Sequence, residues 1–157
     1  MKIKVLINKE EKEFEVRVND VLLDVLRRNG YYGVKCGCRE GECGACTVLV
    51  DGKPVTSCLY PAVRADGKSI TTIEGIENDR IGSVLQEVFL EEGAVQCGFC
   101  TPGMILSSKA LLEKNKNPSE EDIKLALDGN LCRCTGYVKI IRAVKRASEE
   151  LRERGGK

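Results

Sequence analysis

The chain has 157 residues, and its 25 Lys and Arg against 24 Asp and Glu give a formal net charge of +1. This balance predicts no general attraction to nucleic acid or to a membrane surface. No apolar run approaches the roughly 20 residues of a membrane span, so direct membrane insertion is not expected. The sequence contains no histidine, which excludes Rieske clusters, His-ligated haem and His-based acid-base catalysis.

The first half of the chain predicts a small mixed sheet crossed by one helix. Apolar and polar residues alternate on either side of a polar turn at residues 8–11, as expected for two paired strands. A short helix capped by Asn19 and ended by Gly30 is expected next. The Asp51-Gly52 pair is a strong hairpin signal. The apolar positions of these elements are Ile3, Val5 and Ile7; Phe14, Val16 and Val18; Val21, Leu22, Val25 and Leu26; and the predicted strands 47–50, 55–58 and 69–73.

After Gly75 the apolar period becomes helical and predicts four helices in an antiparallel bundle. Thr101 before Pro102 is expected to cap one helix, Ser119 with Asp122 resembles a capping box, and Thr135 is expected to cap the last helix. The sequence therefore predicts two domains, residues 1–75 and 76–157. The helical stripes are Ile81, Val84, Leu85, Val88 and Phe89; Met104, Ile105, Leu106 and Leu112; Ile123 and Leu127; and Ile140, Ile141, Val144 and Ala147 before Gly155-Gly156.

The first cysteine group is Cys38-x4-Cys43-x2-Cys46 with Cys58 farther on. This is the plant-type spacing that places four thiolates around a [2Fe-2S] cluster. The glycines of residues 32–46 argue against regular structure there and allow backbone N–H groups to turn toward cluster sulfurs. Structural zinc also takes four cysteines, but zinc ribbons usually pair two C-x2-C knuckles.

The second group pairs Cys97-x2-Cys100 with Cys132-x-Cys134. All four precede predicted helix starts, so two helix connections can meet around one tetrathiolate site, where helix N-termini stabilise negative charge. On spacing alone, structural zinc stays open for this group. The start of the chain, MKIKVLI, lacks the apolar core of a signal peptide, so the thiols are expected to be ligands in a reducing cytoplasm.

Three motifs carry a family resemblance: GCREGECGACTV from Gly37, QCGFCTPG from Gln96 and CRCTGY from Cys132. They resemble the iron-sulfur subunit of the molybdenum hydroxylases, the group of xanthine dehydrogenase, aldehyde oxidoreductase, carbon monoxide dehydrogenase and 4-hydroxybenzoyl-CoA reductase. The resemblance covers nearly the whole chain. It implies an α+β fold, with a plant-ferredoxin-like β-grasp domain followed by a four-helix domain, and one [2Fe-2S] cluster in each.

The same resemblance implies the ligand sets and the partners. One cluster would face FAD on a medium subunit, and the other would face molybdopterin on a large subunit. Gln96 and Cys134 would contact the pterin, with the alternative that Gln96 only orders its loop. The implied ligands are Cys38, Cys43, Cys46 and Cys58 for the FAD-side cluster, and Cys97, Cys100, Cys132 and Cys134 for the molybdenum-side cluster.

The predicted function is electron transfer within a molybdenum-containing oxidoreductase, one electron at a time between molybdenum and FAD. The chain lacks a molybdenum domain, a flavin fold and an acid-base pair, so substrate chemistry is expected on a partner. Two alternatives are a free two-cluster ferredoxin, which the balanced charge disfavours, and a zinc assembly module. Cys36 is interpreted as a spare thiol, Phe99 and Tyr137 as packing residues, and the charged side of the last helix as a solvated face or a subunit contact.

Overall fold

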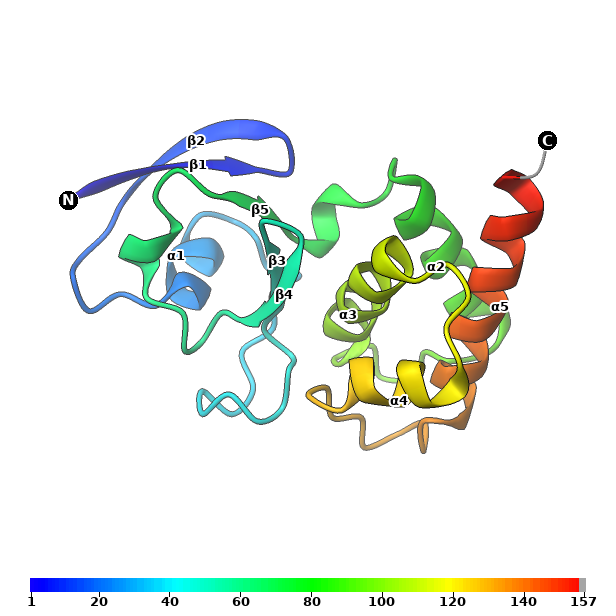
Figure 1. The fold of residues 1–157 in the computed structure, drawn as a ribbon. Helices are drawn as coiled ribbons and strands as arrows, with labels where there is room; N and C mark the ends of the chain where they lie inside the picture. Colours follow the sequence, from blue (N-terminus) through cyan, green and yellow to red (C-terminus); the bar gives the residue numbers. More distant parts are fainter. Residues whose placement is uncertain (156–157) are drawn as a thin grey trace.

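The computed structural model describes residues 1–155 and divides into two lobes. The strands and the first helix form one lobe, and the remaining helices form the other (Figure 1). Short 3-10 helices at Ala62–Ala65 and Ile73–Gly75 lie in the connections. The elements are β1 (Lys2–Ile7), β2 (Glu10–Glu15), α1 (Leu22–Arg28), β3 (Thr47–Val50), β4 (Lys53–Thr56), β5 (Ser69–Thr71), α2 (Arg80–Glu91), α3 (Thr101–Lys114), α4 (Glu120–Leu127) and α5 (Val138–Gly155).

The first lobe is a five-stranded mixed sheet with α1 packed against it. The strand order is β2-β1-β5-β3-β4; β1 and β5 are parallel, and the other pairs are antiparallel. Ile3 and Ile7 of β1, Leu22 and Leu26 of α1, and Ile70 of β5 are almost fully buried in one core. A mixed sheet crossed by one helix, followed by a helical lobe, confirms the predicted α+β fold.

The ends of β2 and the start of α1 differ from the sequence predictions. Strand β2 ends at Glu15, and Val18 is 80% exposed, so its predicted inward position was wrong. Asn19 does not cap α1, because Val21 occupies the N-cap position and makes no side-chain cap. The carboxylate of Asp20 instead accepts a hydrogen bond from the backbone N–H of Arg17 and fixes the turn before the helix.

The predicted hairpin around Asp51-Gly52 is confirmed, but the bounds of its second strand differ from the prediction. Both turn residues have positive φ, 49° and 75°, as a tight hairpin with two left-handed residues requires. Strand β4 begins directly after this turn, two residues earlier than predicted. Cys58 therefore lies beyond the strand, on the connection to the next turn.

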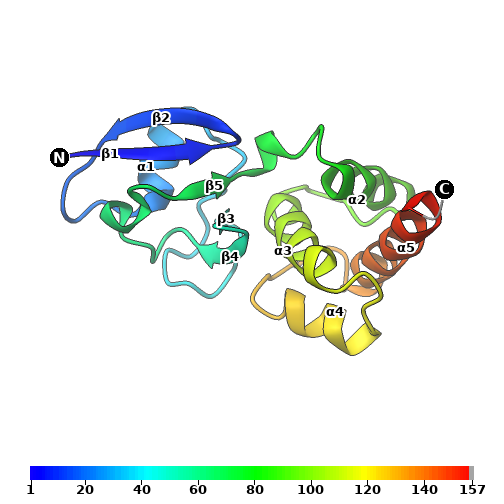
Figure 2. The same cartoon turned by 45° about the horizontal axis from the view of Figure 1, so that its top comes forward.

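Helices α2 to α5 form the second lobe, in which α2–α3, α3–α4, α4–α5 and α5–α2 contacts close a ring. Figure 2 shows this arrangement from a second direction. Leu85, Phe89, Met104, Ile140 and Val144 are buried at its centre. The four predicted helices are confirmed. Within residues 1–155, no helix has the length and apolar character that crossing a membrane requires.

The helix starts confirm one prediction and correct two. Ser119 and Asp122 form a full capping box at α4, as predicted. Thr101 is the first residue of α3 and makes no cap there, and Thr135 lies before α5 begins, so both predicted caps were wrong. Helix α5 is described as far as Gly155, and Gly156 of the predicted terminus lies outside the described residues.

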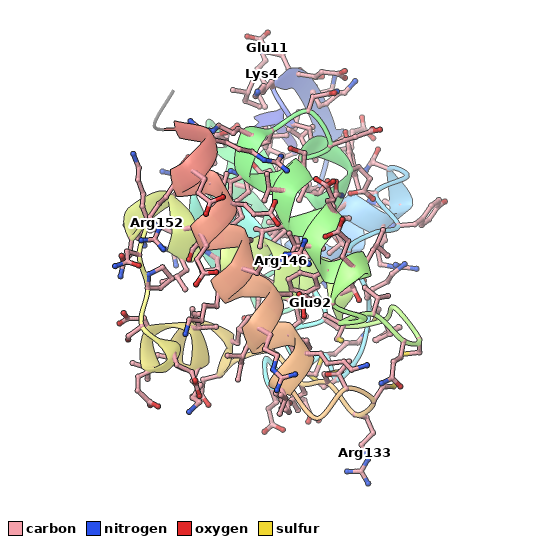
Figure 3. The ribbon with its side chains drawn as sticks, turned by 90° about the vertical axis from the view of Figure 1, so that its right-hand side faces the viewer. Lys4, Glu11, Glu92, Arg133, Arg146 and Arg152 are labelled. Atoms are coloured by element: carbon pink, nitrogen blue, oxygen red, sulfur yellow. The ribbon has the colours of Figure 1, made fainter. Side chains whose placement is uncertain are left out.

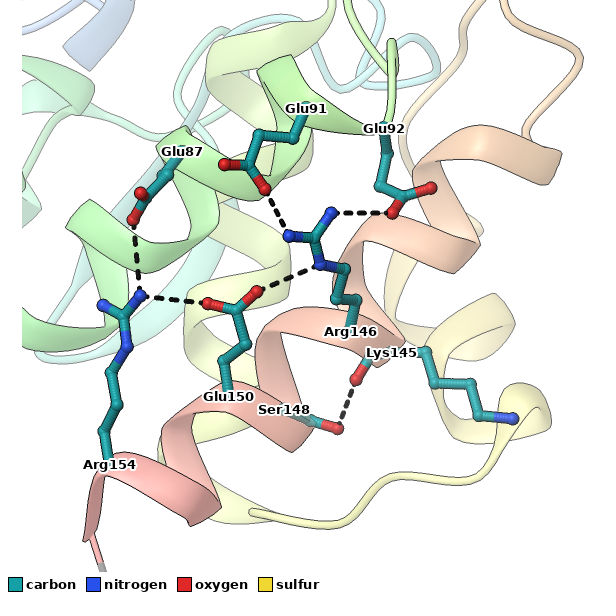
Figure 4. A network of polar contacts seen from close by, with 8 residues as sticks. All are labelled: Glu87, Glu91, Glu92, Lys145, Arg146, Ser148, Glu150 and Arg154. Atoms are coloured by element: carbon teal, nitrogen blue, oxygen red, sulfur yellow. Dashed lines mark hydrogen bonds and ion pairs between the residues drawn. The ribbon is translucent and has the colours of Figure 1, made fainter.

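One part of the charged side of α5 is an ion-pair network with α2, drawn in Figure 4. The guanidinium of Arg146 pairs with the carboxylates of Glu92 and Glu150, each at 3.0 Å, and with Glu91. Arg154 also reaches Glu150, at 3.1 Å. Figure 3 shows Arg146 and Glu92 facing each other between the two helices. This part of α5 is engaged within the lobe and is not a plainly solvated face.

Candidate iron-sulfur sites

Cys38 and Cys43 lie on the irregular loop after α1, as the glycine content predicted. The Cys38 N–H donates to the Cys43 sulfur and the Cys43 N–H donates to the Cys38 sulfur, both at 3.4 Å. The N–H of Glu40 adds a third bond, to the Cys38 sulfur, at 3.3 Å. The N–H groups of Glu40 and Cys43 lower the pKa of Cys38 to about 7. The loop is therefore built to hold a thiolate.

Close packing and one ion pair fix the shape of this loop. A Cβ atom at Gly37 would lie 2.7 Å from the Cys43 sulfur, so any other residue here would displace that side chain. Arg39 has a positive φ of 61°, and its guanidinium pairs with both carboxylate oxygens of Asp24 on α1, at 2.7 and 3.1 Å. The pairing raises the pKa of Arg39 and ties the loop to the rigid helix.

Cys46 and Cys58 form the second pair of the first site. Cys46 precedes β3, Cys58 follows β4, and both thiols are buried beside each other. Burial, followed by this neighbouring thiol, raises the pKa of Cys58 to about 11. A buried thiol of this kind ionises when a metal binds it. The described contacts join Cys38 with Cys43 and Cys46 with Cys58, and the binding of all four to one cluster stays a prediction.

The second site lies where the α2–α3 and α4–α5 connections meet. The Cys134 thiol donates to the Cys97 sulfur at 3.6 Å, and both residues are exposed. Cys100 is buried, and its thiol lies beside that of Cys132. The site thus has one pair of sulfurs at the surface and one pair inside the lobe.

Hydrogen bonds and burial set the charge of these thiols. Burial, followed by the neighbouring Cys132 thiol, raises the pKa of Cys100 to about 12. Burial also acts to raise the pKa of Cys132, but the hydroxyl of Thr135 at 3.1 Å and its N–H at 3.5 Å donate to the sulfur and leave the pKa lowered. Thr135, predicted as a helix cap, therefore serves the cysteine site.

Gln96 lies on the surface beside the exposed cysteine pair. Its side-chain amide nitrogen donates to the backbone carbonyl of Cys134 at 3.2 Å. The two residues predicted to contact a pterin are therefore in contact with each other. This bond orders the loop, as the alternative interpretation of Gln96 expects, and the pterin contact stays a prediction.

The arrangement of sulfurs in pairs fits a two-iron cluster. Tetrahedral zinc needs four donors around one point, whereas a [2Fe-2S] cluster with four thiolates spreads them over two irons. Backbone N–H groups that already point at sulfur favour the same group.

The two sites are in direct backbone contact. The N–H of Leu131 donates to the carbonyl of Cys43 at 2.9 Å, and Cys132 follows Leu131 in the chain. In Figures 1 and 2 the loop of the first site lies beside the segment between α4 and α5. Cys36 stays outside both thiol pairs of the first site and lies near the Arg39 guanidinium.

Comparison with known proteins gives two family matches and close relatives. Residues 5–72 match a 2Fe-2S iron-sulfur cluster binding domain, and residues 72–145 match a [2Fe-2S] binding domain. The nicotinate dehydrogenase small FeS subunit of Eubacterium barkeri is 55% identical over 144 residues, 91% of this chain and 92% of that protein. The chain belongs to the iron-sulfur subunits of the molybdenum hydroxylases. The resemblance noted in the three motifs is confirmed.

Other relatives extend the match of this iron-sulfur subunit. The nicotine 6-hydroxylase small subunit of Paenarthrobacter nicotinovorans is 43% identical over 157 residues, covering 99% of this chain and 94% of that protein. Quinoline 2-oxidoreductase of Pseudomonas putida 86 has a chain that matches with a TM-score of 0.91 and 42% identity, covering 98% of this chain and 96% of that one. The aldehyde oxidoreductase of Desulfovibrio gigas also matches with a TM-score of 0.91, but over only 17% of its chain.

Membership establishes the general activity. The iron-sulfur subunit carries two [2Fe-2S] clusters and transfers electrons within a molybdenum-containing oxidoreductase. The structure adds residues that the motifs did not single out as functional. Thr135 and Tyr137 both lie in the CRCTGY motif and bond to Cys132, and Asn130 precedes it. Their closeness to the cysteines in the sequence was the signal that could have marked them. Their hydrogen-bond partners are set only when the loop folds.

Proposed function

We propose that each lobe holds one [2Fe-2S] cluster and that each iron is bound by one of the thiol pairs. In this assignment the division between the domains falls after Gly75. Cys36 is not a ligand. The first cluster is held by Cys38 with Cys43 and by Cys46 with Cys58; the second is held by Cys97 with Cys134 and by Cys100 with Cys132.

Electrons pass between the two sites at the contact of their loops. Each cluster, when bound, takes up and releases one electron at a time. The chain contributes the route, because Cys43 and Cys132 are joined by a hydrogen bond of 2.9 Å and one residue of backbone. It also keeps the buried thiols Cys46, Cys58 and Cys100 away from water. This direct connection between the two sets of ligands is the observation that carries the proposal.

The exposed end of the second site is the face for the large, molybdopterin-binding subunit. Cys97 and Cys134 are exposed there, and the same chain segments carry partly exposed apolar side chains: Phe99 is 47% exposed, Leu131 56% and Val138 55%. Exposed apolar residues in one region mark an interaction surface. Gln96 and Cys134 face this subunit and contact the pterin.

The first site serves the other end of the path, toward an FAD-binding medium subunit. Its loop carries the half-buried Cys38 in the sheet lobe, while the second site faces the molybdenum partner. Substrate chemistry takes place on the large subunit, and the assembled enzyme works in the cytoplasm. The chain's part is to hold two one-electron carriers at fixed positions.

The ligand assignment is tested by metal analysis of anaerobically purified protein. We expect about four irons and four labile sulfides per chain, as two [2Fe-2S] clusters require. Cys97→Ser should lose one cluster, and the matched variant Cys36→Ser should keep both. Zinc in place of iron, or loss of iron in Cys36→Ser, would contradict the assignment.

A further inference from the structure

The two lobes are joined by polar contacts from a single short segment. Every hydrogen bond between residues 1–75 and residues 76–155 comes from Asn130 or Leu131. The side-chain nitrogen of Asn130 donates to the carbonyl of Gly44 at 3.0 Å and to the hydroxyl of Thr47 at 3.3 Å. Apolar packing also joins the lobes, with Leu49 of β3 in the core of the helical lobe.

Asn130 is buried, and its neighbours determine its orientation. It is 4% exposed, and its side-chain oxygen accepts a hydrogen bond of 2.7 Å from the hydroxyl of Ser107 on α3. The carbonyl of Gly44 can only accept, so the atom that faces it must be the amide nitrogen. One side chain therefore links α3, the loop of the first site and the segment that leads into Cys132.

The backbones of the two lobes approach so closely here that a side chain at Gly44 or at Gly103 would collide with a carbonyl oxygen. A Cβ atom at Gly44 would lie 2.1 Å from the carbonyl oxygen of Gly129, and one at Gly103 would lie 2.5 Å from the carbonyl oxygen of Gly44. Two glycines thus let the loop of the first site approach both α3 and the segment before Cys132. Apolar contacts are non-directional, whereas the hydrogen bonds of Asn130 define one register.

We propose that Asn130 is a positioning residue that fixes the distance and orientation between the two clusters. This inference rests on the proposed function, because it assumes one cluster on each side of the contact. Gly44 lies between the ligands Cys43 and Cys46, and Asn130 lies two residues before Cys132. A shift of the Asn130 amide would therefore move the two ligand loops relative to each other.

The test uses the full chain loaded with both clusters and fully reduced. Two paramagnetic clusters at a fixed short distance split or broaden each other's EPR signals, and this coupling depends on their separation and orientation. Asn130→Asp is nearly isosteric and keeps the acceptor for Ser107, but it places an oxygen against the Gly44 carbonyl. Asn117→Asp adds the same charge at an exposed position and is the matched control.

In wild type and in Asn117→Asp we expect the coupling, and in Asn130→Asp we expect its loss while the g values and potential of each separate cluster stay unchanged. A purely structural role would lower stability without removing the coupling. Thr47→Val removes the second acceptor of the Asn130 amide and should weaken the coupling as well. This variant provides the test where Asn130→Asp takes up too little iron to carry both clusters. Full coupling in an Asn130→Asp protein that carries both clusters would overturn this inference and leave the proposed function intact. Absence of two signals in wild type would overturn the proposed function itself.

Discussion

The hydroxyl oxygen of Tyr137 accepts a hydrogen bond of 3.0 Å from the backbone N–H of Cys132. Tyr137 has a φ of 67° and follows Gly136 at 64°, so two consecutive left-handed residues turn the ring back onto the loop. A left-handed conformation costs a residue with a side chain about 1–2 kcal/mol. The sequence interpretation of Tyr137 as a packing residue therefore misses a polar role next to a ligand.

Tyr137→Phe should raise the reduction potential of the helical-lobe cluster. Without the hydroxyl, the Cys132 N–H is free to donate to sulfur, and hydrogen bonds to sulfur favour the reduced cluster. One net hydrogen bond of about 1 kcal/mol corresponds to a shift of about 40 mV for a one-electron couple. A redox titration followed by EPR measures it.

Tyr60→Phe is the control for this shift, because it removes a hydroxyl that bonds to the Arg64 carbonyl in the other lobe. It should leave the potential of the helical-lobe cluster unchanged. An equal shift in both variants, or none in Tyr137→Phe, would show that the Cys132 N–H does not tune this site.

Gly44→Ala should destabilise the protein far more than Gly52→Ala. Both glycines have positive φ, 66° and 75°, so both substitutions carry the same backbone cost of about 1–2 kcal/mol. Only at Gly44 would the new Cβ meet backbone, 2.1 Å from the carbonyl of Gly129, which adds about 1–3 kcal/mol or more. Thermal unfolding of the two variants measures the difference. Equal midpoints would mean that the loops can move apart at Gly44 without lowering the free energy of unfolding.

Much of the fold follows from local sequence patterns. The alternation around Ile3 and Ile7, the Asp51-Gly52 turn and the Ser119–Asp122 capping box each depend on residues close in sequence, and each was predicted. The predicted cap Asn19 failed because the helix begins later, after Val21, and Thr135 failed because a side chain that can cap a helix can also bond elsewhere. Thr135, for example, bonds to the Cys132 sulfur instead.

The cysteine groups could be predicted from spacing, but the arrangement within each group could not. The pairing of Cys46 with Cys58 depends on where β3 and β4 end, and β4 begins two residues earlier than predicted. The contact of Leu131 with Cys43 joins segments that are far apart in the sequence. Such long-range contacts arise only when the two lobes pack.

Arg146→Met should lower the thermal midpoint, and the loss should shrink at high salt. Arg146 pairs with carboxylates from both α2 and α5, and removing it leaves Glu91, Glu92 and Glu150 close together without their shared cation. Salt screens this repulsion. Arg142→Met, at an exposed position of the same helix, is the matched control and should change little. The same loss at every salt concentration would indicate that Arg146 acts through packing.

Removing iron should open the first-site loop before it unfolds the sheet. The loop around Arg39 contains no helix or strand, and its sulfur contacts are its main internal bonds. Because metal binding and local folding are coupled, trypsin should cut after Arg39 faster in the iron-free chain than in the loaded one. Cleavage after Lys12, in the β1–β2 hairpin, is the internal reference and should not change. Equal cleavage after Arg39 in both forms would show that the loop is ordered without a cluster.

Val138→Glu should weaken binding of the large subunit by roughly tenfold or more, about 1.4 kcal/mol. A carboxylate would lose its water at the proposed interface, while an acidic residue in the first turn of α5 suits the helix dipole and preserves the fold. Val18→Glu, on an 80% exposed residue of the sheet lobe, is the control. Co-purification with the large subunit measures the binding of both variants. Equal yields would place the partner on another face.

The most direct test of the whole account is EPR during graded reduction of the full chain, in wild type and in Cys58→Ser. We predict two distinct [2Fe-2S] signals in wild type, as two tetrathiolate sites require. We predict that Cys58→Ser, which removes a ligand of the first site alone, loses or alters one of them and leaves the other. A single signal from fully loaded wild-type protein, or equal loss of both signals in Cys58→Ser, would contradict a chain with two separate one-electron sites.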